Sequence, residues 1–487
     1  MVINKIVKNY ESVPIQFRAS LWFLICSFIQ KAVSVITTPI FTRIMSPTEY
    51  GRYGVFNSWY GIISIIVALA LTGGVHIQGM VKFDEEKGVF SSSLQGLTAT
   101  LVLGWFIIYI SFRTFWNRVF SLSTVQITAM FVIIWMTAIF GLWANEQRIM
   151  YAYKALVSIT LVSTILRSII EILLVMYCED KATAMIVGWA VADFLMFSWM
   201  FVVQIKRGKE ICNRKFWIYA LAFNIPLVPH YLSQVILNNT DRIMIQRLIG
   251  NEEAGVYNLA YSLSLIMILF NSAFTQTLNP WMYQKIKDKK AKDIAPIAYA
   301  TLIIIGGVNI ILIMLAPEAL AFFAPSPYHG AIWVIPPVSM SVFFMFSYDL
   351  YAKHAFYYEK TRAIMLASVS GAALNILLNY IFISRFGYIA AGYTTLFCYI
   401  VYACAHYIFM RRVCRQCCEG VYPYTTKKII AISCSFLIVG FLCMLTYDYP
   451  VIRYGIITTA AILLFLNRHY IIDYLRKIVY LRKGAPT

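Results

Sequence analysis

The sequence predicts an all-α polytopic membrane protein with about fourteen transmembrane helices, arranged as two parallel six-helix lobes and an appended helix pair. Three observations predict this class. Hydrophobic residues make up 60% of the 487 residues and charged residues only 13%, with a mean hydropathy of +0.70. Apolar segments long enough to cross a bilayer recur along the whole chain. A motif near residue 45 returns near residue 250.

The apolar segments are separated by breaks that carry Gly, Pro, Asn or clusters of charge. A hydrocarbon core of about 30 Å needs about 20 apolar residues per helix, and inside it every backbone polar group must be satisfied within the segment. The predicted spans cover residues 19–41, 54–78, 90–111, 124–144, 155–177, 183–205, 216–238, 254–277, 294–316, 331–350, 363–383, 388–409, 429–446 and 452–467.

The repeated motif defines the predicted domains. A shift of 204 residues aligns residues 41–53 with residues 245–257. The identical pairs are Arg43 with Arg247, Glu49 with Glu253, Gly51 with Gly255, Tyr53 with Tyr257 and Ser58 with Ser262. We therefore predict an N-terminal lobe at 1–205, a C-terminal lobe at 206–409, and helices 13 and 14 with a cytoplasmic tail at 410–487. Both copies enter the membrane from the same side, because six crossings separate their starts.

The basic residues predict the orientation. With the N-terminus inside, about 30 of the 41 lysines and arginines fall on inner segments and about 9 on outer loops, as the excess of basic residues in cytoplasmic loops requires. Both termini are then cytoplasmic. This topology accounts for the net charge of +19 without a nucleic-acid partner. The ten cysteines lie mostly in spans or on the reducing side, so we expect neither a disulfide framework nor a metal site.

Charged residues within spans are the candidate site. Lys31 lies about twelve residues into the first span. Arg167 and Glu171 are four residues apart on one face of the fifth span, and Asp193 lies at a similar depth in the sixth. A charge costs about 2.5–3.5 kcal/mol at a helix centre, so such residues usually face a bundle interior or a watery cavity.

Two interpretations of these charges stay open. Arg167 can be neutralised by Asp193 and Glu171 and simply hold the two helices together. Alternatively, Lys31 and Arg167 line a cationic cavity for an anionic substrate, with Glu171 and Asp193 balancing the charge or carrying a proton.

The seventh span begins the second copy and carries Pro226 and Pro229 just before His230. Prolines inside a helix remove hydrogen bonds and bend it, and in transporters broken helices mark the moving or binding region. His230 is a candidate for the substrate cavity or for a packing role. Asp241 and Arg242 follow at the outer end of this span, where a local ion pair is the simpler interpretation.

Sequence motifs of soluble catalysis are missing. There is no phosphate-binding loop of the G-x-x-x-x-G-K-[ST] type, no H-E-x-x-H and no G-x-S-x-G. No predicted loop exceeds about 20 residues, which leaves little room for a soluble catalytic domain. The sequence therefore predicts a transporter that is not an enzyme.

Four segments resemble the polysaccharide-transporter (Wzx-type) flippases of the multidrug/oligosaccharidyl-lipid/polysaccharide exporter superfamily. They are TRIMSPTEYGRYG at 42–54, PLVPHY at 226–231, TDRIM at 240–244 and GVYNLAY at 255–261. The motif residues are Arg43, Glu49, Gly51, Pro226, Pro229, Asp241, Arg242 and Gly255.

The resemblance implies two six-helix lobes with alternating access, in a bacterial inner membrane. It implies a flippase that translocates an undecaprenyl-pyrophosphate-linked oligosaccharide to the periplasmic leaflet for O-antigen-like, lipopolysaccharide or capsule-like synthesis. Implied partners are the lipid-linked oligosaccharide, membrane lipids, a polysaccharide polymerase and chain-length proteins. No cofactor is expected, and coupling to H⁺ or Na⁺ is left open. An ion-coupled drug or cation antiporter of the same superfamily is the alternative, followed by a glycan-assembly membrane enzyme.

Overall fold

The computed structural model describes residues 15–466 and 468, apart from 265 and 359. In this part of the chain every regular element is a helix, which confirms the all-α prediction. Among the described residues, eleven helices are long and apolar enough to cross a membrane, or twelve when the bent pair Ser326–Trp333 and Ile335–Tyr357 counts as one span. The chain is thus a multi-pass membrane protein. The predicted cytoplasmic ends, 1–14 and 469–487, lie outside the described residues.

Two of the fourteen predicted spans do not coincide with a helix that is both long enough and apolar enough to cross a membrane. The helix at Pro47–Ala68 is 22 residues long, but its first half is polar. The helix at Pro450–Leu466 is apolar but has only 17 residues. Of the other twelve predicted spans, eleven coincide with single helices that qualify, and the span 331–350 coincides with the bent pair.

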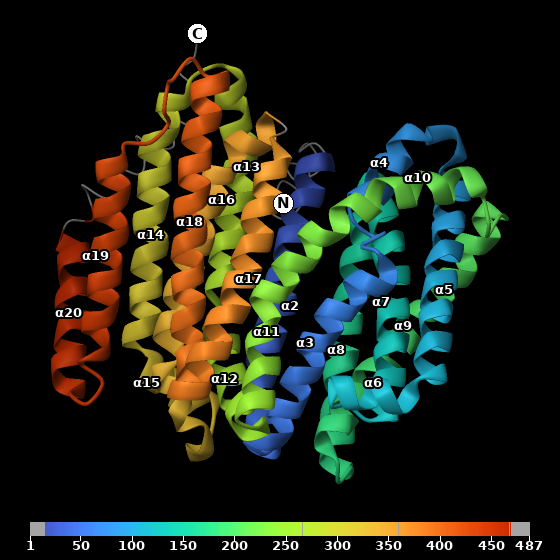
Figure 1. Cartoon of the computed structure of the whole chain (residues 1–487), viewed down its shortest axis with the longest axis horizontal. Coiled ribbons are helices and arrows are strands. Elements are labelled where there is room, and N and C mark those ends of the chain that lie inside the picture. The colour runs from blue at the N-terminus through green and yellow to red at the C-terminus, as the bar shows by residue number, and fades with distance from the viewer. Residues whose placement is uncertain (1–14, 265, 359, 467, 469–487) are drawn as a thin grey trace, which may run out of the picture. The chain divides into compact units, whose positions relative to one another are not determined.

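The chain forms two compact units, residues 1–246 and 247–487. Unit 1 contains α2 (Ile15–Ile44), α3 (Pro47–Ala68), α4 (Gly74–Lys82), η1 (Asp84–Glu86), α5 (Lys87–Ser111), α6 (Arg113–Phe120), α7 (Thr124–Ile149), α8 (Tyr153–Tyr177), α9 (Lys181–Gly208), α10 (Arg214–Asn224), η2 (Ile225–Leu227) and most of α11 (Val228–Leu248) (Figure 1). The predicted lobe boundary at 205/206 stays a prediction. In the structure, α10 and most of α11 belong to unit 1.

Unit 2 contains α12 (Asn251–Ser264), α13 (Ile266–Lys287), η3 (Ala291–Asp293), α14 (Ile294–Met314), α15 (Ala316–Phe323), η4 (Ser326–Trp333), α16 (Ile335–Tyr357), α17 (Thr361–Phe386), α18 (Ile389–Cys417), α19 (Thr426–Met444) and α20 (Pro450–Leu466). Within it, α19 packs against α14 and α16, and α20 contacts α14 (Figure 1).

The repeat recurs in the helix boundaries. Helix α2 ends at Ile44 and α11 at Leu248, while α3 begins at Pro47 and α12 at Asn251, so both pairs keep the offset of 204. In unit 1, α9 packs on α7 and α8; in unit 2, α18 packs on α16 and α17. The short helices α6 and α15 follow the long helices α5 and α14 in the same order.

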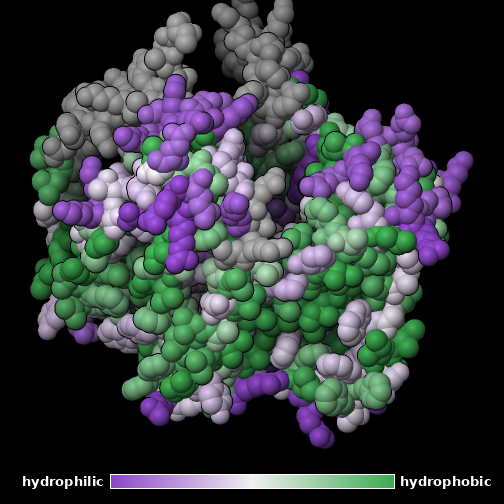
Figure 2. All heavy atoms as spheres, turned by 45° about the horizontal axis from the view of Figure 1, so that its top comes forward, coloured by the Kyte–Doolittle hydropathy of each residue, from purple (hydrophilic) through white to green (hydrophobic). Residues whose placement is uncertain are grey.

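On the face shown in Figure 2, hydrophobic residues cover the middle of the surface and hydrophilic residues gather above and below them. Helix α8 has an exposed apolar surface, because Val162, Ile165, Ile169, Leu173 and Met176 are about half exposed and lie along one face. An exposed apolar stripe of this length is expected where a helix meets lipid.

The second predicted span, 54–78, is not one continuous helix. It breaks at residues 69–73 into α3 and α4, and Leu69 and Ala70 both have positive φ, 49° and 51°. Non-glycine residues adopt this left-handed conformation only at a cost, so surrounding contacts must hold it. The buried Asn224 amide donates to the Leu69 carbonyl at 2.9 Å, and the buried Asn145 amide donates to the Thr72 carbonyl at 2.8 Å.

Candidate functional site

The predicted pairing of Arg167 with Glu171 on α8 is confirmed. Arg167 Nε lies 2.7 Å from Glu171 Oε1. The Glu171 side chain is 6% exposed, whereas that of Arg167 is 30% exposed. The carboxylate is therefore enclosed, whereas part of the Arg167 side chain remains exposed.

Helix α9 supplies the second wall of this site. The Arg167 guanidinium lies 3.8 Å from the centre of the Trp189 ring, within the range of a cation–π contact. The Trp189 indole donates to Asp193 Oδ2 at 2.8 Å. No ion pair joins Arg167 to Asp193 among the described residues. Trp189 thus links the cation to the second carboxylate, and the direct Arg167–Asp193 pair considered from the sequence is not formed.

A glycine permits the close approach of α8 and α9. A Cβ atom on Gly188 would lie 3.0 Å from the Glu171 Cα and 3.3 Å from its backbone nitrogen. Small residues allow helix backbones in membranes to approach in this way.

Helix α3 contributes aromatic residues to the same site. The Tyr53 hydroxyl lies 3.5 Å from Arg167 Nη2, and the Tyr60 ring lies 4.8 Å from Trp189 at 64°. Tyr60 also donates to Thr137 of α7 at 3.4 Å. Sequence analysis missed Tyr53, Tyr60 and Trp189 as members of the site. Trp189 was detectable, since it lies four residues before Asp193 on the same helix face.

We name Tyr53, Tyr60, Arg167, Glu171, Trp189 and Asp193 the Arg167 cluster. Among the described residues only one carboxylate pairs directly with the cation, and the guanidinium has more N–H donors than Glu171 and Tyr53 use. Arginine can bind phosphate oxygens through paired N–H groups. The cluster can therefore hold an anion on the exposed side of Arg167.

Lys31 and His230, the other predicted cavity residues, are not joined to the cluster by any described contact. Lys31 is exposed on α2, and its neighbour Gln30 contacts Thr164 of α8 at 3.4 Å. His230 is half-buried in the first turn of α11, and its buried Nδ1 has no hydrogen-bond partner among the residues that the structure describes. Their role in substrate binding stays a prediction.

The proline pair lies at the expected interruption. Pro226 falls in the 3-10 turn Ile225–Leu227, and Pro229 in the first turn of α11. Helix α10 crosses the ends of the helices of unit 1, while α11 runs along them (Figure 1). The missing N–H groups of the prolines explain why the α-helix does not continue through this segment.

The motif residues at 43–54 build and anchor a turn. Ser46 and Glu49 form a capping box at the start of α3, with the Ser46 amide 2.8 Å from the Glu49 carboxylate, and Arg43 donates to the Pro39 carbonyl at 2.9 Å. Gly51 is buried. Arg52 makes two contacts of 3.1 Å with Asp180, which caps α9. The motif joins the α2–α3 turn to the start of α9.

The Arg52–Asp180 pair has a definite pH dependence. Partial burial acts to raise the pKa of Asp180, but hydrogen bonds from the Thr183 hydroxyl and amide, with the Arg52 charge, outweigh it and lower the pKa. The carboxylate therefore stabilises the fold above its unfolded-state pKa, and this contribution is lost as the pH falls through the lowered folded-state value. Asp180→Asn keeps the capping oxygen and removes the charge. We expect it to lower the free energy of unfolding by at most about 1 kcal/mol at neutral pH, because the pair is exposed.

Denaturant unfolding of both proteins across acidic pH measures this. The two curves should converge at low pH, when the wild-type carboxyl is protonated. A difference that does not change with pH would contradict the assignment.

The remaining motif residues lie on α11 and α12. Arg242 is buried and its Nη1 lies 3.3 Å from the Ser58 hydroxyl of α3 and 3.2 Å from Asn239. Asp241 and Gly255 are buried as well. Arg242 thus contacts both α3 and a residue of its own helix, α11.

Unit 2 contains buried polar groups that sequence analysis did not assign to the site. Lys353 Nζ of α16 lies 2.6 Å from Asp349 Oδ1, and the Lys353 side chain is only 6% exposed. A second buried group, Asn375 and Asn379 of α17 with Thr394 and Thr395 of α18, is hydrogen-bonded internally. The i,i+4 spacing of Asp349 and Lys353 was the available signal.

Two family models match the chain. The model described as polysaccharide biosynthesis protein matches residues 17–286, and the MatE model matches residues 226–381. A Haemophilus influenzae protein described as an uncharacterized membrane protein is 22% identical over 365 residues, covering 71% of this chain and 85% of that protein.

Solved structures share the fold. The lipid II flippase MurJ in an inward closed conformation matches with a TM-score of 0.70 at 15% identity, over 93% of this chain and all of that one. An inward-facing multidrug resistance MATE family transporter of the MOP superfamily matches with a TM-score of 0.58 at 14% identity, over 79% of this chain and 95% of that one.

Proposed function

We propose that this chain, which belongs to the polysaccharide biosynthesis protein family, is a flippase for a lipid-linked oligosaccharide. It moves the oligosaccharide from the cytoplasmic to the outer leaflet of a bacterial inner membrane, for synthesis of a surface polysaccharide of the O-antigen or capsule type. The match of the family model to residues 17–286 carries the proposal. The multi-pass fold supports it, because the family's substrate class must cross a membrane to reach the cell surface.

The Arg167 cluster supplies an anion site in this proposal. The guanidinium of the partly exposed Arg167 binds the pyrophosphate that joins sugar to lipid, and Glu171 and Trp189 hold it in place. Lys31, predicted at a similar depth, adds a second cation, and His230 contributes from the interrupted helix. The lipid tail stays in the bilayer while the two lobes alternate between inward and outward access.

An ion-coupled drug or cation antiporter is the second candidate. The MatE match to residues 226–381 favours it. In this alternative Asp193, which the Trp189 indole holds, would balance a cationic substrate. The enclosed position of Glu171, already neutralised by Arg167, leaves fewer acidic groups for a cation.

A strain lacking the gene distinguishes the two. We expect loss of surface polysaccharide and accumulation of the lipid-linked precursor on the cytoplasmic leaflet, measured by accessibility of the glycan to a membrane-impermeant reagent. Normal polysaccharide with new sensitivity to cationic drugs would instead support the antiporter.

A further inference from the structure

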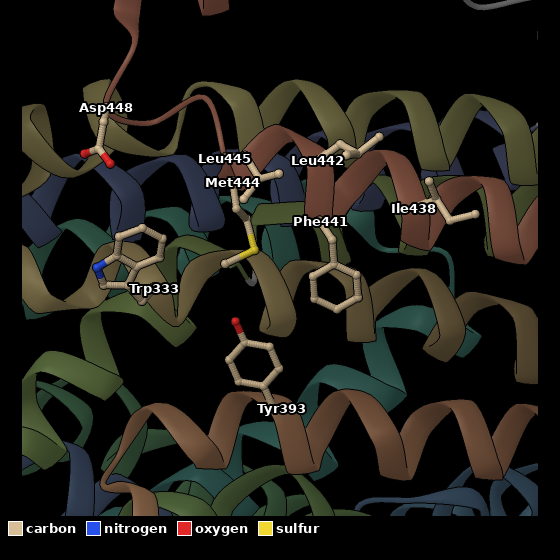
Figure 3. Close-up of a pocket in the computed structure, with 8 residues that line it drawn as sticks. All are labelled: Trp333, Tyr393, Ile438, Phe441, Leu442, Met444, Leu445 and Asp448. Carbon is tan, nitrogen blue, oxygen red and sulfur yellow. The ribbon is translucent and has the colours of Figure 1, made fainter.

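A pocket of ≈ 630 Å³ opens at one end of unit 2, and its lining residues do not belong to the Arg167 cluster. Helix α19 and the turn after it form one wall, with Tyr393 of α18 opposite and Trp333 of η4 at one end. Figure 3 shows the Tyr393 hydroxyl pointing toward Met444 across the pocket, with the Phe441 ring beside them.

The α19 wall belongs to the membrane-facing surface. Ile438, Leu442 and Leu445 are each more than half exposed, and α19 is apolar and long enough to span a bilayer. These residues extend over about two helical turns, or about 10 Å. A membrane-facing pocket with such walls is filled by hydrocarbon.

The other end of the pocket is polar. Trp333 and Tyr393 are 40% and 38% exposed, and these residue types gather at the level of lipid headgroups. Asp448 lines the pocket beside them, is exposed, and has no hydrogen bond or ion pair among the described residues. The cation nearest in sequence, Arg453, is buried and paired with Glu318. The pocket therefore has an apolar wall and, at the level expected for lipid headgroups, a carboxylate that no cation of the described residues neutralises.

We propose that this pocket binds one phosphatidylethanolamine molecule of the bilayer. An acyl chain lies along Ile438, Leu442 and Leu445, and the ammonium of the headgroup pairs with Asp448. The Tyr393 hydroxyl and the Trp333 indole are donors that suit the lipid phosphate. An anionic lipid without the ammonium would meet the Asp448 carboxylate with like charge, so the site prefers an aminophospholipid.

Titration of the delipidated, purified full chain with phosphatidylethanolamine or phosphatidylglycerol, followed by native mass spectrometry, tests this. The wild-type protein should bind phosphatidylethanolamine more tightly. Asp448→Asn should weaken that binding about threefold to fivefold, the range expected for an exposed ion pair of up to about 1 kcal/mol, and should remove the preference between the two lipids.

Leu442→Trp should weaken binding of both lipids, because the larger side chain fills the pocket. Ile462→Trp is the matched control: Ile462 is 53% exposed on α20 and does not line the pocket, so binding should not change. Retention of the headgroup preference in Asp448→Asn would overturn the proposal. So would unchanged binding in Leu442→Trp, or displacement of phosphatidylethanolamine from the pocket by polyprenyl phosphate.

Discussion

Arg167→Ala abolishes transport while the protein still inserts into the membrane. The substitution removes the guanidinium that we propose binds the substrate pyrophosphate. It also leaves Glu171 enclosed without its partner, and breaking one side of a buried pair costs about 3–5 kcal/mol. Complementation of the deletion strain, the amount of membrane-inserted protein and the thermal stability of the purified protein measure these effects.

The structure shows which second substitution separates binding from stability. Because Arg167 pairs with Glu171 and not with Asp193, the informative double variant is Arg167→Gln with Glu171→Gln. We expect it to recover most of the lost stability, since the enclosed Glu171 charge is removed together with its partner. It should remain inactive. Activity in the stable double variant would show that Arg167 only holds α8 and α9 together. Arg52→Ala is the matched arginine control, since it breaks an exposed pair and should cost at most about 1 kcal/mol.

Asp349→Asn destabilises unit 2 by about 3–5 kcal/mol. Lys353 is nearly enclosed, and Asp349 Oδ1 at 2.6 Å is the carboxylate that neutralises its ammonium. Chemical unfolding of the purified protein in detergent, or protease susceptibility of unit 2, measures the loss. Adding Lys353→Met should restore the stability to within about 1.5 kcal/mol of the wild type, because a methionine fills a similar volume without a charge.

The control for this pair is Lys289→Met, which breaks a contact of 3.6 Å between two largely exposed side chains and should have little effect. Wild-type stability in Asp349→Asn would contradict the buried-pair assignment. Equal loss in the single and double variants would place the cost in packing around Lys353.

The sequence predicted the class of the fold and the position of its helices, because a bilayer imposes the same apolar length on every span. It also predicted a repeat at an offset of 204 residues, and the ends of α2 and α11 lie at that offset. It did not predict the break at residues 69–73. Leu69 and Ala70 are ordinary helix residues, and the hydrogen bonds to this segment, from Asn224 to Leu69 and from Asn145 to Thr72, come from residues distant in sequence.

The candidate site was also predictable in part, from the spacing of residues along a helix. The Arg167–Glu171 pair follows from helical periodicity within α8, so spacing alone was sufficient. The position of Trp189 between Arg167 and Asp193 depends on how closely α8 and α9 approach at Gly188, which spacing cannot give. Lys353 and Asp349 show the same i,i+4 signal as Arg167 and Glu171. For this second pair, only the structure shows that Lys353 is nearly enclosed, because spacing does not give burial.

Translocation by the purified protein is the most direct test of the account. Proteoliposomes would contain a lipid-linked oligosaccharide with a pyrophosphate linkage, and accessibility of the glycan to an external glycosidase would report its movement between leaflets. We expect translocation by the wild-type protein, and none by the stable double variant Arg167→Gln with Glu171→Gln. No translocation by the wild-type protein, together with uptake of a cationic drug under the same conditions, would contradict it.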